Sequence, residues 1–227
     1  MSAARRAPAL TTVDALTESL RERILGGELK PGTPLREEAL SSEYEVARHS
    51  LRSALRTLQG EGIVQIEPNR GARVKSLSAE DVRGLSELRM ALEVEAARMA
   101  LERSGGALPA SVHRNAERLA ALCRRSRHSP APCPANAGGR GWGAVAEAHE
   151  ALHHEIVLAA DSPRLAAAHL QAGAELRLFV LQLPPSWTFE RIASDHLELV
   201  RALEQGGAEV LRPHIAESTR ALLSASA

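Results

Sequence analysis

Residues 45–59 read EVARHSLRSALRTLQ, a stretch in which apolar and basic side chains separate at helical spacing. The apolar stripe consists of Val46, Leu51, Ala54, Leu55 and Leu58, whereas the opposite face or its edge carries Arg48, His49, Arg52 and Arg56. A short helix of this kind buries one side in a small domain and presents guanidinium groups outward. Two interpretations are open at this point: a DNA-reading helix whose N-terminal residues enter the major groove, or an amphipathic helix with a solvated basic face.

The residues in front of this stretch predict two more helices. From Thr12, apolar side chains recur at intervals of three and four until Gly26-Gly27 ends the pattern. Residues 30–34 (KPGTP) are predicted to form a rigid turn, and residues 37–44 a short second helix. Short helices in this order, followed by the basic helix, predict a helix-turn-helix.

A β-hairpin is predicted directly after the basic helix. Residues 63–66 and 72–75 are short β-prone runs, joined by a turn that contains Asn69, Arg70 and Gly71. A hairpin in this position is a wing, and Arg70 at its tip is expected near a minor groove or phosphates. A plain structural hairpin remains the alternative for the segment alone, but the order of three helices and a wing favours DNA binding.

The composition limits the classes of protein to which the chain can belong. The chain has 227 residues and no formal net charge, with 28 Lys and Arg against 28 Asp and Glu, so DNA binding depends on where the arginines lie. No apolar run is long enough for a membrane span or a signal peptide, which predicts a cytoplasmic protein without a membrane partner. The two cysteines, Cys123 and Cys133, are too few for a disulfide framework or a Cys-based metal site.

The part after the hairpin is expected to be all-helical. One long amphipathic helix is predicted over residues 79–102, with Leu88 on its apolar face. Further helices are predicted over 110–124, 142–160, 163–183, 188–205 and 208–224, with Pro213 either in the first turn of the last helix or kinking it. Residues 1–10 are expected to be a flexible basic arm, and residues 125–141 a Pro- and Gly-rich loop. The predicted fold class is mainly α, with a winged helix-turn-helix domain at 1–76 and an all-α bundle at 77–227.

A cluster of histidines is a candidate metal site. His149 and His153 are four residues apart in a predicted helix, so both project from one face and could share an ion. His196 and His214 would supply further nitrogens if their helices face this pair across the bundle core. His154 and His169 are expected to be surface or packing residues.

From about Thr12 to Val74, the N-terminal part resembles the winged-helix domain of GntR-family transcriptional regulators. The resemblance is carried by residues 27–37 (GELKPGTPLRE), 46–55 (VARHSLRSAL), 61–64 (EGIV) and Asn69-Arg70-Gly71. The family's recognition helix begins with a Ser/Thr-Arg pair and has a second Arg one turn later, which correspond to Ala47-Arg48 and Arg52. The resemblance therefore implies DNA contacts by Arg48, His49, Ser50, Arg52, Arg70 and Gly71. Because Ala47 replaces a hydroxyl residue and His49 is uncommon there, we expect the operator to differ from the family consensus.

The C-terminal part is similar to the FCD effector domain of the FadR subgroup of these regulators. The similarity lies in residues 89–100 (RMALEVEAARMA), 153–165, Asp195-His196 and 202–206 (ALEQG). Many such domains bind a divalent ion through an Asp and three His, beside a cavity for a small carboxylate. The Asp position holds His149 in this sequence, and the first two His positions are His153 and His196.

The last ligand position of the family falls near Ser218, whereas His214 lies one helical turn earlier, and we assign His214 to it. Four imidazoles would favour Zn, Ni or Cu over Mg or Ca. Arg89 is a candidate second anchor for the carboxylate effector through bidentate pairing. The alternative for Arg89 is a salt bridge to Glu93, one turn away on an exposed face.

The resemblance implies a ligand-responsive regulator and no enzyme. We expect a repressor that binds a pseudo-palindromic double-stranded DNA operator as a homodimer and senses a small carboxylate in a metal-containing helical domain. One alternative is a helical metalloenzyme, which is disfavoured because no carboxylate base is expected to point into the site, although Glu150 and Asp195 are close in sequence. Another is a DNA-binding protein whose C-terminal bundle only dimerises.

Overall fold

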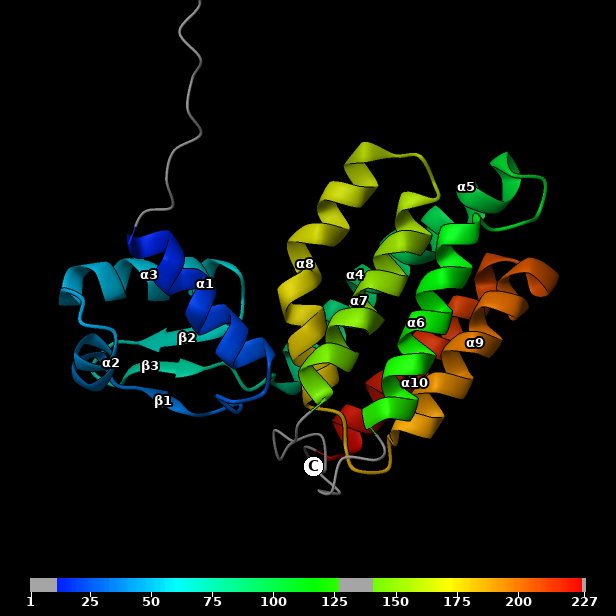
Figure 1. Cartoon of the computed structure of the whole chain (residues 1–227). Coiled ribbons are helices and arrows are strands. Elements are labelled where there is room, and N and C mark those ends of the chain that lie inside the picture. The colour runs from blue at the N-terminus through cyan, green and yellow to red at the C-terminus, as the bar shows by residue number, and fades with distance from the viewer. Residues whose placement is uncertain (1–11, 127–140, 226–227) are drawn as a thin grey trace, which may run out of the picture.

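The computed structural model describes residues 12–126 and 141–225, which form a small N-terminal domain beside a larger helical bundle (Figure 1). The predicted basic arm at residues 1–10 and most of the predicted loop at 125–141 lie outside the described residues. The predicted domain boundary after residue 76 falls between the last strand, which ends at Val74, and the next helix, which begins at Ala79. Helix α8 (Pro163–Leu181) is the bundle element that lies alongside the N-terminal domain, where it contacts α1.

The N-terminal domain is a winged helix-turn-helix, as predicted. Its helices and strands are α1 (Thr12–Leu25), β1 (Pro34–Leu35), α2 (Glu37–Glu43), α3 (Arg48–Gly60), β2 (Val64–Glu67) and β3 (Gly71–Val74). The strands form an antiparallel sheet in the order β1-β3-β2. The predicted helices and the hairpin are confirmed within one to three residues at their ends.

Strand β1 was not predicted, because residues 30–34 were assigned to a turn. The strand has two residues, too few to show a period in the sequence, and it exists because the turn brings it beside β3. Gly32 N donates to Val74 O (2.9 Å) and Val74 N donates to Thr33 O (2.9 Å) just before the paired residues. Pro34 is tolerated as the first residue of this edge strand, where no ladder hydrogen bond from its nitrogen is needed.

The apolar stripe of α3 forms the centre of the N-terminal core. Leu51, Leu55 and Leu58 are almost completely buried against α1, where Leu20 and Ile24 are equally buried. Burial of one face forces the other into solvent, so the basic residues of the stretch at 45–59 stay exposed. Packing therefore decides which side of α3 is available to a partner.

The C-terminal domain is all-helical over the described residues, as predicted. Its helices are α4 (Ala79–Arg89), the π-helical segment η1 (Met90–Val94), α5 (Glu95–Arg103), α6 (Ala110–Ser126), α7 (Trp142–Leu158), α8, α9 (Phe189–Gly206), the 3-10 turn η3 (Ala208–Val210) and α10 (Leu211–Ala225). Pro213 lies in the first turn of α10, where its missing N–H costs no helical hydrogen bond.

The predicted helix at 79–102 is interrupted by the π turn η1. This turn holds an extra residue relative to an α-helical turn and so rotates the buried face of the chain. Leu88, predicted on the apolar face, lies before this turn and is 42% exposed, because α4 buries Leu85 and Arg89 instead; Glu93, inside the turn, is buried as well. The helical periodicity of the sequence therefore predicts the wrong buried face around Leu88.

Helix α3 begins without a side-chain cap. Ala47 is its N-cap residue, with extended backbone angles and no side-chain hydrogen bond. Serine at an N-cap accepts a hydrogen bond from a free N–H of the first turn, which alanine cannot do. We therefore expect Ala47→Ser to raise the free energy of unfolding by about 1 kcal/mol in urea denaturation. Ala47→Val, which also lacks an acceptor, is the control, and equal stability of the two variants would contradict the capping explanation.

Candidate functional site

The recognition helix presents the predicted contact residues at its N-terminal end. Arg48, His49 and Arg52 are exposed, and Ser50 is half-buried. The two arginines pair with carboxylates of α2, which sequence reasoning missed: Arg48 Nη2 lies 3.4 Å from Glu38 Oε1 and Arg52 Nε lies 2.8 Å from Glu37 Oε2.

These ion pairs are exposed and therefore weak, on the order of 0–1 kcal/mol each. An Arg–phosphate or Arg–guanine contact is charge-assisted and can be bidentate, so it can replace them. In the free protein the two guanidinium groups are thus paired with carboxylates of α2.

The wing lies on the same face as α3. Arg70 at its tip has a side chain that is 75% exposed, and its guanidinium lies 3.3 Å from Glu67 Oε2 within the same turn. Asn69 and Gly71 have positive φ values of 63° and 76°, as the predicted Asn/Gly turn requires. A shallow groove lined by Arg52 and Arg56 on one side and by Asn69 and Gly71 on the other joins the helix to the wing. The predicted DNA-contacting residues thus form one continuous surface.

The four predicted metal ligands come together inside the bundle, and we call them the inner cluster: His149 and His153 on α7, His196 on α9 and His214 on α10. The ring centroids of His149 lie 4.6 Å from those of both His153 and His196, and His214 lies 4.7 Å from His196. Ligand nitrogens of the first three residues are all within 4.8 Å of one another. Ser218, the family's usual position, instead donates its hydroxyl to Ile215 O at 3.0 Å.

Hydrogen bonds fix which nitrogens of the inner cluster carry lone pairs. His196 Nδ1 donates to Ile192 O at 2.7 Å, and His153 Nδ1 donates to Glu93 Oε2 at 2.8 Å. Both rings therefore keep Nε2 as the acceptor, and metal-binding histidines are commonly oriented in this way. The buried atoms His196 Nε2 and His149 Nδ1 have no hydrogen-bond partner among the described residues.

Burial keeps these histidines neutral. Desolvation lowers the pKa of His196 to about 3 and holds the pKa values of His149 and His214 well below 6.5. The pKa of His153 is also lowered by burial, although Glu93 opposes the shift. Neutral imidazole is the form that binds a transition metal. The four histidines could therefore bind an ion without first releasing protons.

Glu93 is a functional residue that sequence reasoning placed wrongly. We expected no carboxylate to face the histidines, but this side chain, which lies in the π turn η1, is 0% exposed and contacts His153. Burial opposes its ionisation, yet Arg89 and His153 hold the pKa of Glu93 well below its usual range. A buried carboxylate beside the site is therefore charged.

Arg89 forms the alternative salt bridge to Glu93, and this pair is buried instead of exposed. Arg89 Nε lies 2.8 Å from Glu93 Oε1, with 3% and 0% of the two side chains exposed. The Arg89 Nη2 atom also lies 3.4 Å and 3.5 Å from the two ring nitrogens of His153. The guanidinium thus reaches the inner cluster, and its contact with an effector stays a prediction.

His169 was expected at the surface or in packing, but it is 1% exposed and connected to the same carboxylate. Its Nε2 lies 3.4 Å from Glu93 Oε1, and its Nδ1 lies 3.2 Å from Nδ1 of His154. No regular spacing in the sequence relates His169 on α8 to His154 on α7. Only the packing of these two helices brings them together.

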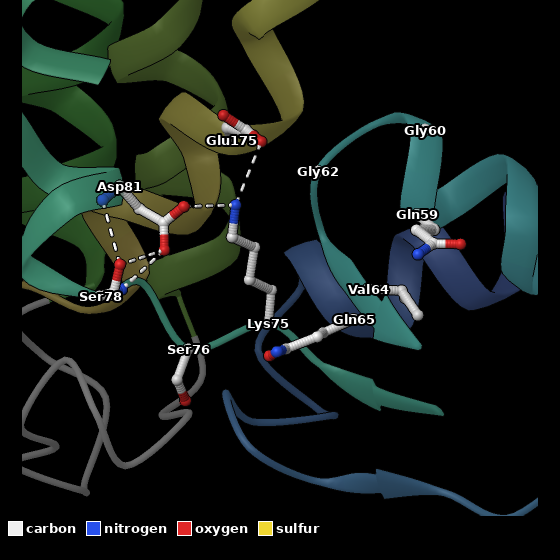
Figure 2. A pocket seen from close by; sticks show the side chains of 10 residues that line it. All are labelled: Gln59, Gly60, Gly62, Val64, Gln65, Lys75, Ser76, Ser78, Asp81 and Glu175. Carbon is white, nitrogen blue, oxygen red and sulfur yellow. Dashed lines mark hydrogen bonds and ion pairs between the residues drawn. The ribbon is translucent and has the colours of Figure 1, made fainter. Parts of the chain in front are cut away.

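The two domains meet at a junction built around Lys75, which Figure 2 shows reaching toward the bundle. Lys75 Nζ lies 2.9 Å from Asp81 Oδ1 and 3.6 Å from Glu175 Oε1 of α8. Two residues later, Leu77 N donates to Gln182 Oε1 at 3.0 Å. The linker is thus held against the start of α4 and the end of α8.

Helix α7 also touches the N-terminal domain. A Cβ atom at Gly143, in its first turn, would lie 2.6 Å from Cα of Gly26, directly after α1. Only glycine permits this approach of the two backbones. Helix α7, which carries His149 and His153, therefore contacts the N-terminal domain through its first turn.

A winged helix-turn-helix with exposed arginines, followed by a helical bundle with a polar centre, defines a DNA-binding transcriptional regulator. Residues 12–74 match the family described as "Bacterial regulatory proteins, gntR family", and residues 84–220 match the FCD domain. The chain belongs to the GntR family and has an FCD domain, a type of domain that binds small-molecule effectors.

Similar proteins agree with this assignment. The HTH-type transcriptional regulator BphR of Paraburkholderia xenovorans is 31% identical over 91% of this chain and 83% of its own length. The HTH-type transcriptional repressor RspR of Escherichia coli K12 is 40% identical over 36% of each chain. A GntR transcriptional regulator from Rhodococcus sp. RHA1 has the same fold, with a TM-score of 0.72 at 20% identity, over 94% of this chain and 98% of that one. The relatives confirm a regulator and not an enzyme.

Among the described residues, no helix is both long and apolar enough to cross a membrane.

The inner cluster predicts a pH dependence of stability for metal-stripped protein. The unfolded chain takes up protons on these histidines near pH 6.5, whereas the folded chain does so only at lower pH, because burial lowers their pKa values. Stability is therefore present above about pH 6.5 and is lost as the pH falls below it. We expect the melting temperature to fall between about pH 8 and pH 5. The decrease should shrink in His149→Gln and persist in His113→Ala, and a pH-independent melting temperature would contradict this account.

Proposed function

We propose that the protein is a ligand-responsive repressor, which binds a pseudo-palindromic operator as a homodimer and senses a small carboxylate through a divalent metal in the inner cluster. The observation that carries the proposal is the position of α7. This helix holds His149 and His153 and, through Gly143, rests on the DNA-binding domain. A shift of α7 on ligand binding at the histidines would thus be transmitted to the N-terminal domain, which contains the recognition helix.

The inner cluster fits a transition metal. Its donors are uncharged imidazoles, which suit Zn, Ni or Cu better than Mg or Ca. His149 Nδ1 and His196 Nε2 are buried without a partner among the described residues, and unsatisfied buried nitrogens of this kind cost free energy that a metal bond would recover. His149, His153, His196 and His214 would hold the ion. When bound, the metal would supply a Lewis-acidic position for a carboxylate oxygen.

Arg89 supports a carboxylate as the effector class. Its guanidinium reaches His153 while its Nε stays on Glu93, so the side chain is fixed in orientation beside the proposed metal. A guanidinium and a metal ion together would bind the two oxygens of a carboxylate.

For DNA binding, the proposal assigns Arg48 and Arg52 to base or phosphate contacts and Arg70 to the minor groove or phosphates. His49 and Ser50 would adjust specificity. The name of RspR, which matches the N-terminal part, supports the repressor role. Two recognition helices related by two-fold symmetry would meet an operator of the same symmetry.

Effector control requires that the carboxylate bind two arrangements of the dimer with different affinity. In one arrangement α7 and α8 hold the N-terminal domain through Gly143 and through the contact of Glu175 with Lys75. Ligand contacts that shift α7 would change these junctions, and with them the spacing of the two recognition helices.

The DNA surface is tested by substitution on a duplex selected from random sequences. We expect Arg48→Ala and Arg52→Ala each to weaken binding by about 1–3 kcal/mol, roughly 5- to 150-fold, because each removes a charge-assisted contact. Arg118→Ala, which removes an exposed charge from α6, is the control for net charge. Unchanged affinity in both α3 variants would refute the recognition-helix assignment.

The sensing site is tested by thermal shift of metal-stripped protein with Zn²⁺ and a panel of small carboxylates. Zinc should raise the melting temperature, and a cognate carboxylate should raise it further only when zinc is present, because each binds the native state. His196→Ala should lose the increase caused by the carboxylate and keep only part of the increase caused by zinc, whereas His113→Ala should keep both. A bundle that only dimerises would respond to neither zinc nor any acid.

A further inference from the structure

Helix α7 carries two pairs of potential ligands, not one. His149 and His153 are four residues apart and belong to the inner cluster, whereas Glu150 and His154, also four apart, project about 100° away. The first pair faces His196 on α9. The second pair meets His169 on α8, and we call these three residues the outer cluster: Glu150, His154 and His169.

The outer cluster has the geometry of a metal site. One ligand atom from each residue lies within 4.8 Å of the other two. His154 Nδ1 and His169 Nδ1 are 3.2 Å apart. Two nitrogens bound to one tetrahedral zinc at about 2.0–2.1 Å are separated by about 3.3 Å, so the two imidazoles already have this spacing.

Neighbouring groups set the proton positions that a metal requires. His169 Nε2 donates to Glu93 Oε1 at 3.4 Å, which leaves the lone pair on Nδ1, the atom that faces His154. Second-shell hydrogen bonding to a carboxylate is the usual support of a metal-binding histidine.

A hydrogen bond between the two imidazoles is the purely structural alternative, and it leaves one group unexplained. Glu150 Oε1 is buried and has no hydrogen-bond donor among the described residues. This oxygen lies against α8, only 3.2 Å from the position of a Cβ atom at Gly173, one turn after His169. An unsatisfied buried carboxylate oxygen is costly, and a shared cation would satisfy all three side chains together.

The position of the Glu150 carboxylate also argues against a role as a catalytic base at the inner cluster. Residues 149–153 have the His-Glu-x-x-His spacing in which zinc peptidases use the glutamate on metal-bound water. Here Glu150 Oε1 packs against Gly173 and belongs with His154 and His169, and the carboxylate bonded to the inner cluster is Glu93.

We propose that Glu150, His154 and His169 form a second zinc site, distinct from the inner cluster. Two imidazoles and one carboxylate are an established donor set for zinc with an open fourth position. Glu150 and His154 are half-buried, so the site is reached from solvent more easily than His149, His153 and His196 of the inner cluster, which are all buried. This site does not require the inner cluster to hold a metal.

Glu93 connects the two clusters. One of its oxygens accepts from His153 of the inner cluster and the other from His169 of the outer cluster. A single buried negative charge therefore orients one ligand of each site. Zinc bound to His169 would fix the position of α8. The same helix carries Glu175, which contacts Lys75 at the domain junction.

The test is zinc stoichiometry of the metal-stripped full-length protein, titrated against a competing chromophoric chelator. We expect two zinc ions per chain for the unmodified protein and for the control His113→Ala. We expect one for His154→Ala, for Glu150→Gln and for His196→Ala, and none for the double variant His154→Ala/His196→Ala. Circular dichroism and melting curves report whether each variant is folded, and the half-exposed position of His154 makes its variant the safest.

The two sites can fail independently. Zinc that remains in His196→Ala and disappears when Glu150→Gln is added supports the outer site, even if the inner cluster binds nothing. A folded His196→Ala protein that binds no zinc overturns the outer site and leaves the inner one in place. A stoichiometry that His154→Ala and Glu150→Gln both leave unchanged overturns it as well.

Discussion

A charged carboxylate at the centre of the helical bundle organises the residues around it. Glu93 is fully buried, and Arg89 and His153 offset the cost of keeping it ionised there. Because the carboxylate accepts hydrogen bonds from histidines on two helices, it fixes the ring orientation of His153 on α7 and His169 on α8. Removing one partner of such a buried pair would leave a charge uncompensated, at a cost of several kcal/mol. Glu93 lies within the π turn η1, so the polar centre is built at a local irregularity of the backbone.

Helix α7 links this centre to the DNA-binding domain. Its middle carries ligands on two adjacent faces, and its first turn lies against the end of α1 at Gly143. Helix α8 makes a second connection, because it carries His169 and, less than two turns later, Glu175, which contacts Lys75. Two helices thus connect the polar centre to the N-terminal domain. On the N-terminal domain, Arg48 and Arg52 pair with acidic residues of α2, and these ion pairs are weak because they are exposed.

Much of the fold follows from local patterns. The periodicity of residues 45–59, the Asn/Gly turn of the wing and the amphipathic helices of the bundle all recur in the structure close to their predicted ends. The inner cluster could also be predicted, because a spacing of four residues places His149 and His153 on one face and the family resemblance supplies His196. Two elements could not. Strand β1 is too short to show a period, and the π turn at Met90–Val94 changes the buried face without any signal in the residue pattern.

The sequence by itself therefore determined the helix boundaries, the winged helix-turn-helix, the exposed basic face and one pair of histidines, since each depends on residues within a few turns of one another. Tertiary structure alone decided that Glu93 points inward, that Arg89 is buried with it, and that His169 meets His154 and Glu150. The contacts of His169 with His154 and Glu93 join residues 15 and 76 positions apart. They arise from how α7 and α8 pack against η1, and helical periodicity contains no information about which faces of separate helices meet.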